Sequence, residues 1–102
     1  MAEIVFSSEA INDLSETKKY ITEELCNEKA AINVLGKIMS DIGILSKFPK
    51  AGAPLSSIVN IETEYRFLVC GNYSVFYRIE NDNVFVVRII YGRRDFMRIL
   101  FG

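Results

Sequence analysis

The first half of the chain spaces its apolar residues with the period of an α-helix. Over residues 9–25 the apolar positions that fall at helical spacings are Ile11, Leu14, Ile21 and Leu25. This pattern predicts an amphipathic helix of about five turns. Asn27 is a candidate N-cap for a second helix, in which apolar residues repeat at alternating steps of four and three: Ala31, Leu35, Ile38, Ile42 and Leu45. The short connection predicts an antiparallel helical hairpin.

The second half of the chain changes to a period of two, with β-branched and aromatic residues. This pattern predicts strands at residues 65–70, 73–80 and 84–91, and a short β-prone run predicts another at residues 4–6. Residues 48–60 have the composition of a loop. The turns at residues 71–72 and 81–83 are too short to join anything but antiparallel neighbours.

These elements predict a single α+β domain spanning residues 1–102. The expected architecture is an N-terminal strand and an antiparallel helical hairpin packed on a C-terminal antiparallel β-meander. Half of the residues are hydrophobic and a quarter are charged, as in globular chains. The residues expected in the core, because they share a helical or strand spacing, are Ile11, Leu14, Ile21, Leu35, Ile38, Ile42, Phe67, Val75 and Tyr77.

Several chemistries are excluded by the composition. The chain has no histidine, so a Ser-His-Asp triad, a Cys-His dyad and His-ligated zinc sites are unavailable, and we expect neither a metal nor a cofactor. Cys26 and Cys70 lie far apart and form no C-x-x-C pair, which predicts free thiols in a reducing cytoplasm. No segment resembles a signal peptide or a membrane span, so we expect a soluble cytoplasmic protein without a membrane partner.

Charge is segregated along the chain, although the formal net charge is only −1. Residues 1–64 contain all the lysines and carry a net charge of −4, whereas residues 65–102 contain all the arginines and carry +3. Arginine presents a planar fork of donors suited to phosphate or carboxylate. The C-terminal third is therefore the expected binding site for an anionic partner.

The meander strands place an arginine on each of three neighbouring strands. Because a buried, unpaired guanidinium is costly, each should point away from the helix-covered core, so the three are expected on one open face. Two more arginines follow the glycine that ends the last strand. The candidate target-binding residues are Arg66, Arg78, Arg88, Tyr91, Arg93 and Arg94. The alternative is that these arginines only balance nearby acids such as Glu62, Glu64 and Asp95.

The order of elements and several short segments resemble the RelE/ParE superfamily of bacterial type II toxins. The segments are Ser7-Ser8-Glu9-Ala10 with Asp13-Leu14, Phe48-Pro49, Tyr65-Arg66-Phe67-Leu68-Val69, Asn72-Tyr73-Ser74-Val75-Phe76-Tyr77-Arg78 and Tyr91-Gly92-Arg93-Arg94-Asp95. The resemblance implies a small toxin that a cognate antitoxin wraps and neutralises, in a hetero-oligomer. The apolar tail is too short to be an independent helix and must pack on this domain or on a partner. The candidate antitoxin-binding residues are therefore Phe96, Met97, Ile99, Leu100 and Phe101.

The superfamily contains two activities, and the residues favour one of them. RelE-type toxins cleave ribosome-bound mRNA with a basic set of residues, whereas ParE-type toxins inhibit DNA gyrase without nuclease chemistry. Ser74 stands where the nuclease has an arginine, no lysine follows Lys50, and no tyrosine follows Tyr91. The C-terminal segment Tyr91-Gly92-Arg93-Arg94-Asp95 is more similar to the corresponding segment of ParE-like members.

We therefore expect a non-enzymatic gyrase inhibitor closer to the ParE branch. The alternative is a metal-independent ribonuclease in which Arg94 stabilises the transition state on ribosome-bound mRNA. A third hypothesis is an inactive member of the family that only binds an antitoxin.

Overall fold

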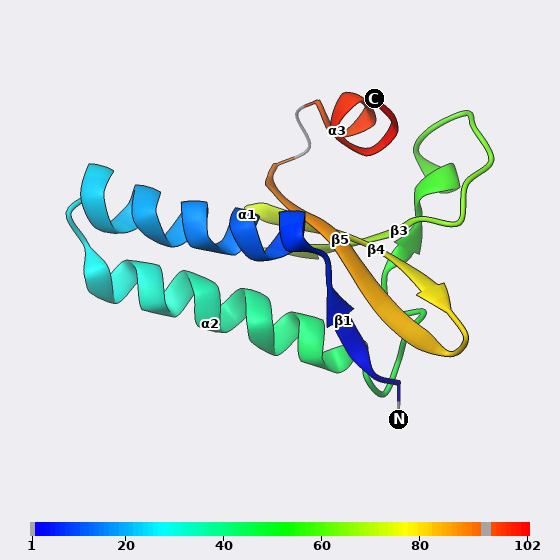
Figure 1. Ribbon diagram of the computed structural model, residues 1–102, viewed down its shortest axis with the longest axis horizontal. Helices are drawn as coiled ribbons and strands as arrows, with labels where there is room; N and C mark the ends of the chain where they lie inside the picture. The colour runs from blue at the N-terminus through cyan, green and yellow to red at the C-terminus, as the bar shows by residue number, and fades with distance from the viewer. Residues whose placement is uncertain (1, 93–94) are drawn as a thin grey trace.

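A five-stranded sheet and a helical hairpin form the two layers of the computed structural model, which describes residues 2–92 and 95–102 (Figure 1). The strand order is β1-β5-β4-β3-β2. The predicted α+β architecture is confirmed. The elements are β1 (Ile4–Phe6), α1 (Ser8–Lys19), the π-helical η1 (Tyr20–Glu24), α2 (Glu28–Ile44), β2 (Ala53–Pro54), the 3₁₀ turn η2 (Leu55–Ser57), β3 (Arg66–Cys70), β4 (Tyr73–Glu80), β5 (Asn83–Tyr91) and α3 (Phe96–Phe101).

The hairpin begins and turns at residues that can cap helices. The Ser7 hydroxyl accepts a hydrogen bond from the Ala10 backbone at the start of α1, and Asn27 does the same for Ala30 at the start of α2. The first helix reaches its full predicted length only because a π-helical turn extends α1. The two helices run antiparallel and side by side (Figure 1). Within the described residues, no helix is long and apolar enough to cross a bilayer.

The sheet is mixed because β1 pairs in parallel with β5, while all other neighbours are antiparallel. β1 accompanies β5 only from Val84 to Val86. An irregularity between β4 and β5 then shifts the register, so that Tyr77 lies opposite Val86 but Phe76 lies opposite Arg88. Such a bulge re-aims the side chains beyond it. It decides which face of the sheet Arg88 occupies.

Two hydrophobic clusters lie on opposite faces of the sheet. The larger one packs between the sheet and the hairpin and contains Ala10, Ile38, Ile42, Leu45, Cys70, Val75, Tyr77, Val84, Val86 and Ile89. The smaller one lies on the face turned away from the hairpin, here called the outer face, and contains Leu55, Phe67, Phe76 and Ile90.

The predicted core is largely confirmed, but one of its residues is exposed and another is buried on the outer face of the sheet. Ile21, Ile38, Ile42, Val75 and Tyr77 are buried as expected, and Leu14 and Leu35 are half-buried. Ile11 is 57% exposed, so its assignment to the core is wrong. The neighbouring Ala10 and Asp13 take the buried stripe of α1 instead. Phe67 is buried, but in the cluster on the outer face.

The short helix α3 covers part of the outer face. Its residues Phe96, Ile99 and Leu100 pack against the smaller cluster, and the ring of Phe96 stacks on Phe76 with centroids 5.5 Å apart. Tyr65 meets Phe101 edge to face at 5.6 Å. The apolar tail was predicted to pack on this domain or on a partner, and the structure shows that it packs on this domain.

Candidate functional site

Arg88 forms the most enclosed ion pair in the described part of the chain. Its Nε and Nη2 donate to the two carboxylate oxygens of Asp13, each at 2.8 Å, and the Asp13 side chain is only 8% exposed. The same carboxylate accepts the backbone N–H of Ile89 at 2.8 Å. The hydrogen bonds that Arg88 donates to Asp13 raise the pKa of its guanidinium, so its charge is permanent. Arg88 therefore ties the last strand to the first helix.

Arg66 lies on the face of the sheet that the hairpin covers. It stands opposite Tyr77, which belongs to the cluster under the hairpin, whereas Arg78 and Arg88 stand opposite outer-face residues. The prediction that Arg66, Arg78 and Arg88 share one open face is therefore wrong. The Arg66 guanidinium is not left without hydrogen-bond acceptors on this face. It donates to two loop carbonyls, those of Gly52 at 3.1 Å and Lys50 at 3.3 Å.

Arg78 remains on the outer face, half-exposed. Its Nε lies 3.2 Å from a carboxylate oxygen of Glu80, and its guanidinium carbon lies 5.4 Å from the centroid of the Phe85 ring. Near the C-terminus, Arg98 lies 3.8 Å from Asp95. The alternative that the candidate arginines balance nearby acids thus holds for Arg78 and Arg88, although their partners Glu80 and Asp13 are not among the acids named from the sequence.

A shallow groove lies where β5 ends, next to the turn between β3 and β4. Its volume is about 290 Å³, and its lining residues are Val69, Gly71, Asn72, Tyr73, Ser74, Tyr91 and Gly92. The backbone N–H of Gly92 donates to the Asn72 carbonyl at 2.7 Å, which holds the end of β5 against the turn. Gly92 has a φ of +63°, a conformation that glycine adopts without strain. The predicted Arg93 and Arg94 follow directly in sequence and lie outside the described residues.

Aromatic side chains and a buried hydroxyl set the chemistry of this groove. Tyr73 and Tyr91 meet edge to face, with ring centroids 5.3 Å apart, and Tyr91 is 54% exposed. Burial raises the pKa of the Tyr73 phenol, which keeps it protonated at neutral pH. Ser74 is buried. Among the described residues, no group of three or more acidic or cysteine side chains could hold a metal ion. Apart from tyrosine hydroxyls, the described lining offers no acid or base.

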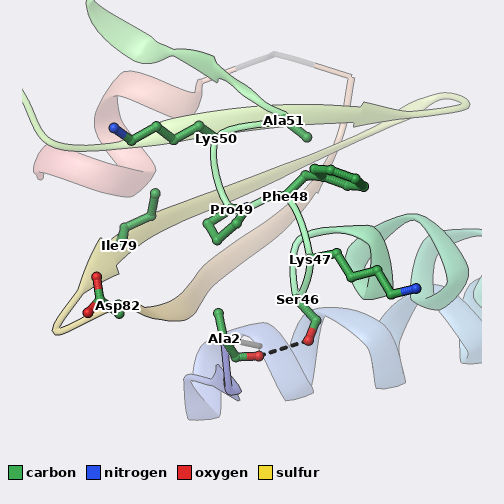
Figure 2. Close-up of a pocket in the computed structure, with 9 residues that line it drawn as sticks. All are labelled: Ala2, Ser46, Lys47, Phe48, Pro49, Lys50, Ala51, Ile79 and Asp82. Atoms are coloured by element: carbon green, nitrogen blue, oxygen red, sulfur yellow. Dashed lines mark hydrogen bonds between the residues drawn. The ribbon is translucent and has the colours of Figure 1, made fainter.

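A larger hollow lies at the other end of β4, and the sequence pattern did not predict it. It has a volume of about 930 Å³ and is lined by Ala2, Ser46, Lys47, Phe48, Pro49, Lys50, Ala51, Ile79 and Asp82 (Figure 2). Its wall is the loop after α2, which Tyr77 holds in place by donating to the Pro49 carbonyl at 2.7 Å and accepting from the Gly52 N–H at 2.9 Å. The Phe48 ring points away from Ile79 and Asp82 (Figure 2). The composition of residues 48–60 predicted this loop, but not the hollow beside it.

The hairpin exposes more apolar surface than the sequence suggested. Its exposed large side chains are Ile11, Tyr20, Leu25, Ile32, Met39 and Ile44. By contrast, the tail residues predicted to bind a partner are partly used within the fold: Phe96, Ile99 and Leu100 are half-buried, while Met97 and Phe101 are exposed. An apolar partner would therefore find contacts both on the hairpin and on α3.

Solved structures with a similar fold come from toxin-antitoxin systems. A chromosomal ParDE system from P. aeruginosa aligns with a TM-score of 0.76 and 19% identity, covering 90% of this chain and 97% of that chain. The RelBE2 complex from Mycobacterium tuberculosis aligns with a TM-score of 0.62 and 21% identity, covering 88% of this chain and 96% of that chain. A DinJ-YafQ complex from E. coli aligns with a TM-score of 0.58 and 18% identity, covering both chains fully. At these identities the likeness shows the fold alone.

Comparison with family models identifies the family itself. A search of the curated proteins gave no significant match. In contrast, the model described as the ParE toxin of the type II toxin-antitoxin system parDE matches residues 4–96, from β1 to the first residue of α3. This confirms the predicted resemblance and its closer branch. The match spans nearly the whole domain, and the chain therefore belongs to the ParE toxin family of type II toxin-antitoxin systems.

Proposed function

We propose that this toxin inhibits DNA gyrase by binding it through the end of β5, and that a cognate antitoxin neutralises the toxin by covering its exposed apolar surface. The binding surface consists of the exposed Tyr91, the groove that begins beside it, and the two arginines that follow Gly92 in sequence. No bond in the target is broken. The toxin acts by occupying its target.

The observation that carries this proposal is the way the described arginines are used. Arg88 is paired with Asp13, Arg78 with Glu80, and Arg66 with two loop carbonyls. Catalysis of phosphoryl chemistry needs donors aimed at a developing charge and free of competing acceptors. Guanidinium groups that already hold acceptors inside the protein support a structural role for these three residues.

The groove itself supports binding over catalysis. Ser74, whose position a RelE-like nuclease fills with arginine, contributes a neutral hydroxyl. The burial that raises the pKa of Tyr73 makes that phenol a poor general base at neutral pH. Tyrosine and arginine are instead among the residues that dominate protein interfaces.

Antitoxin binding is supported by the amount of apolar surface left open. Large apolar side chains remain exposed on the hairpin and on α3, among them Ile11, Tyr20, Leu25, Met97 and Phe101. An amphipathic segment could bury such residues by laying its apolar face on the hairpin. The three similar structures described above come from toxin-antitoxin systems.

The proposal is tested by two assays on one preparation of the full chain. Gyrase supercoiling of plasmid DNA is measured beside cleavage of mRNA on translating ribosomes, with an Arg93→Ala/Arg94→Ala variant in both. Arg78→Ala serves as the matched control, because it removes an arginine from the outer face away from the groove. We expect loss of supercoiling with wild type and with Arg78→Ala, restored supercoiling with the double variant, and intact mRNA throughout. Ribosome-dependent cleavage with unaffected gyrase would establish the ribonuclease alternative.

A further inference from the structure

The helix α2 carries two apolar seams, and only one of them is used inside the protein. The buried seam packs on the sheet through Ala31, Ile38, Ile42 and Leu45. A second seam starts one residue later and follows steps of four, three and four, which is the spacing of core positions in a coiled coil. It consists of Ile32, Gly36, Met39 and Gly43.

The second seam is exposed along its whole length. Ile32 is 60% and Met39 44% exposed, although both are large apolar side chains. A Cβ atom added at Gly36 or at Gly43 would meet no atom within 4 Å. Glycine inside a helix lowers its stability relative to alanine. Nothing in the described fold therefore requires glycine at either position.

Large and small residues alternate in this seam in a way that fits the seam of a second copy. Ile32 and Gly43 lie equally far from the midpoint between residues 37 and 38, and so do Gly36 and Met39. When two such helices pair antiparallel about a two-fold axis at that midpoint, Ile32 of each copy faces Gly43 of the other, and Met39 faces Gly36. Each large side chain then fills the gap above a glycine, and the helices can approach closely.

Charge follows the same symmetry at the ends of the seam. Glu28 at the start of α2 and Lys47 just beyond its end are both exposed, and they too lie equally far from the midpoint. The antiparallel arrangement brings Glu28 of each copy to the level of Lys47 of the other. A parallel arrangement would instead place like charges side by side.

We propose that the toxin forms a homodimer through this seam, with two α2 helices packed antiparallel about a two-fold axis. The interface is isologous, because the same patch of both copies contributes large and small residues. This inference goes beyond the proposed function and does not depend on gyrase as the target.

The first test is the oligomeric state of the purified full chain, measured by sedimentation velocity over increasing concentration. We expect a reversible dimer for wild type. Ile32→Lys places a charge opposite Gly43 of the second copy and should weaken the dimer by at least about tenfold. Ile44→Lys is the matched control, because Ile44 is 50% exposed on the same helix but lies outside the seam, and it should leave the dimer unchanged.

A second variant separates loss of the dimer from loss of the fold. Gly36→Leu has room in the monomer and replaces glycine by a strong helix former, so its thermal midpoint should not fall. It fills the gap that receives Met39, so the dimer should be lost. The orientation is tested in a Cys26→Ser background: a mixture of Gly36→Cys and Met39→Cys chains should form a disulfide-linked dimer, whereas neither variant alone should do so.

Three results would overturn the proposal. The wild type could stay monomeric at the highest concentration reached, or Gly36→Leu could dimerise as well as wild type. Alternatively, the free chain could be monomeric while Gly36→Leu weakens only the complex with the antitoxin. In that last case the seam is an antitoxin-binding surface, and the gyrase proposal is unaffected.

Discussion

Asp13 of α1 and Arg88 of β5, 75 positions apart in the sequence, are joined by two hydrogen bonds of 2.8 Å. The pair lies where β1 stops covering the edge of β5. At that edge the Ser7 backbone N–H donates to the Val86 carbonyl, the Ser7 hydroxyl donates to the Val87 carbonyl, and Asp13 accepts from the Ile89 N–H. Beyond the end of β1, Ser7 and Asp13 thus supply the hydrogen bonds that a neighbouring strand would make with the backbone of β5. These bonds fix the position of β5 before it reaches the groove.

Removing the charge of Asp13 should destabilise the fold. Asp13→Asn leaves the partly buried Arg88 without a counter-ion, and we expect the free energy of unfolding to fall by about 3 kcal/mol. Asp95→Asn is the control, because Asp95 and Arg98 are 66% and 80% exposed and their pair should contribute less than about 1 kcal/mol. Urea denaturation of both variants measures the difference. Equal losses in the two variants would contradict the structural role of the buried pair.

Two glycines should respond in opposite directions to alanine. At Gly52 an added Cβ would lie 2.6 Å from the Phe67 carbonyl oxygen and 2.7 Å from the Tyr77 hydroxyl, so Gly52→Ala should cost more than about 2 kcal/mol through displaced backbone and a strained loop. At Gly36 the Cβ meets nothing within 4 Å, and Gly36→Ala should raise stability by about 0.5–1 kcal/mol. Thermal unfolding of the two variants compares them directly. A Gly52→Ala protein as stable as wild type would contradict the close packing of Gly52 against the Tyr77 hydroxyl and the Phe67 carbonyl.

The two cysteines should differ sharply in reactivity. Burial, with a smaller contribution from nearby Asp41, raises the pKa of Cys70 to about 12, so almost no thiolate exists at neutral pH. Cys26 is exposed at the tip of the hairpin. A thiol reagent at pH 7.5 should modify Cys26 quickly in the folded protein and Cys70 only in denaturant. Rapid modification of both in the native state would contradict the packing of Cys70 under α2.

The hairpin and the meander could be predicted because their signals are local. Helical spacing, the Ser7 and Asn27 caps and the short turns each act over a few residues, and the structure follows them closely. Ile11 failed because helical periodicity alone does not decide which of two adjacent stripes faces the sheet. The small Ala10 allows close approach to β5, and Asp13 finds its partners there.

The arginine surface could not be predicted because it depends on contacts between distant segments. The sequence predicted Arg66, Arg78 and Arg88 on one open face, but the side of each strand that the hairpin covers is known only from the packed structure. The irregularity between β4 and β5 and the partner of Arg88 on α1 are also invisible to a strand pattern. The exposed residues Ile32 and Met39 were overlooked because the regular buried seam accounted for α2 without them.

Toxicity in cells should distinguish the structural arginine from the terminal pair. Arg88→Lys retains a charge near Asp13 but loses the two-point geometry, and we expect a moderate loss of stability with the inhibitory activity of the folded fraction preserved. Arg93→Ala/Arg94→Ala should fold with wild-type stability and lose toxicity on induction. Circular dichroism on the purified chains provides the folding control. A folded double variant that remains fully toxic would exclude the two arginines from the target surface.

Gyrase inhibition is measured most directly as the dose response of plasmid supercoiling by purified gyrase in the presence of the 102-residue chain. The proposed function predicts that wild type abolishes supercoiling at a concentration at least about tenfold below that needed by the Arg93→Ala/Arg94→Ala variant, as expected for the loss of interface arginines. Supercoiling that continues unchanged at saturating wild-type toxin would contradict it.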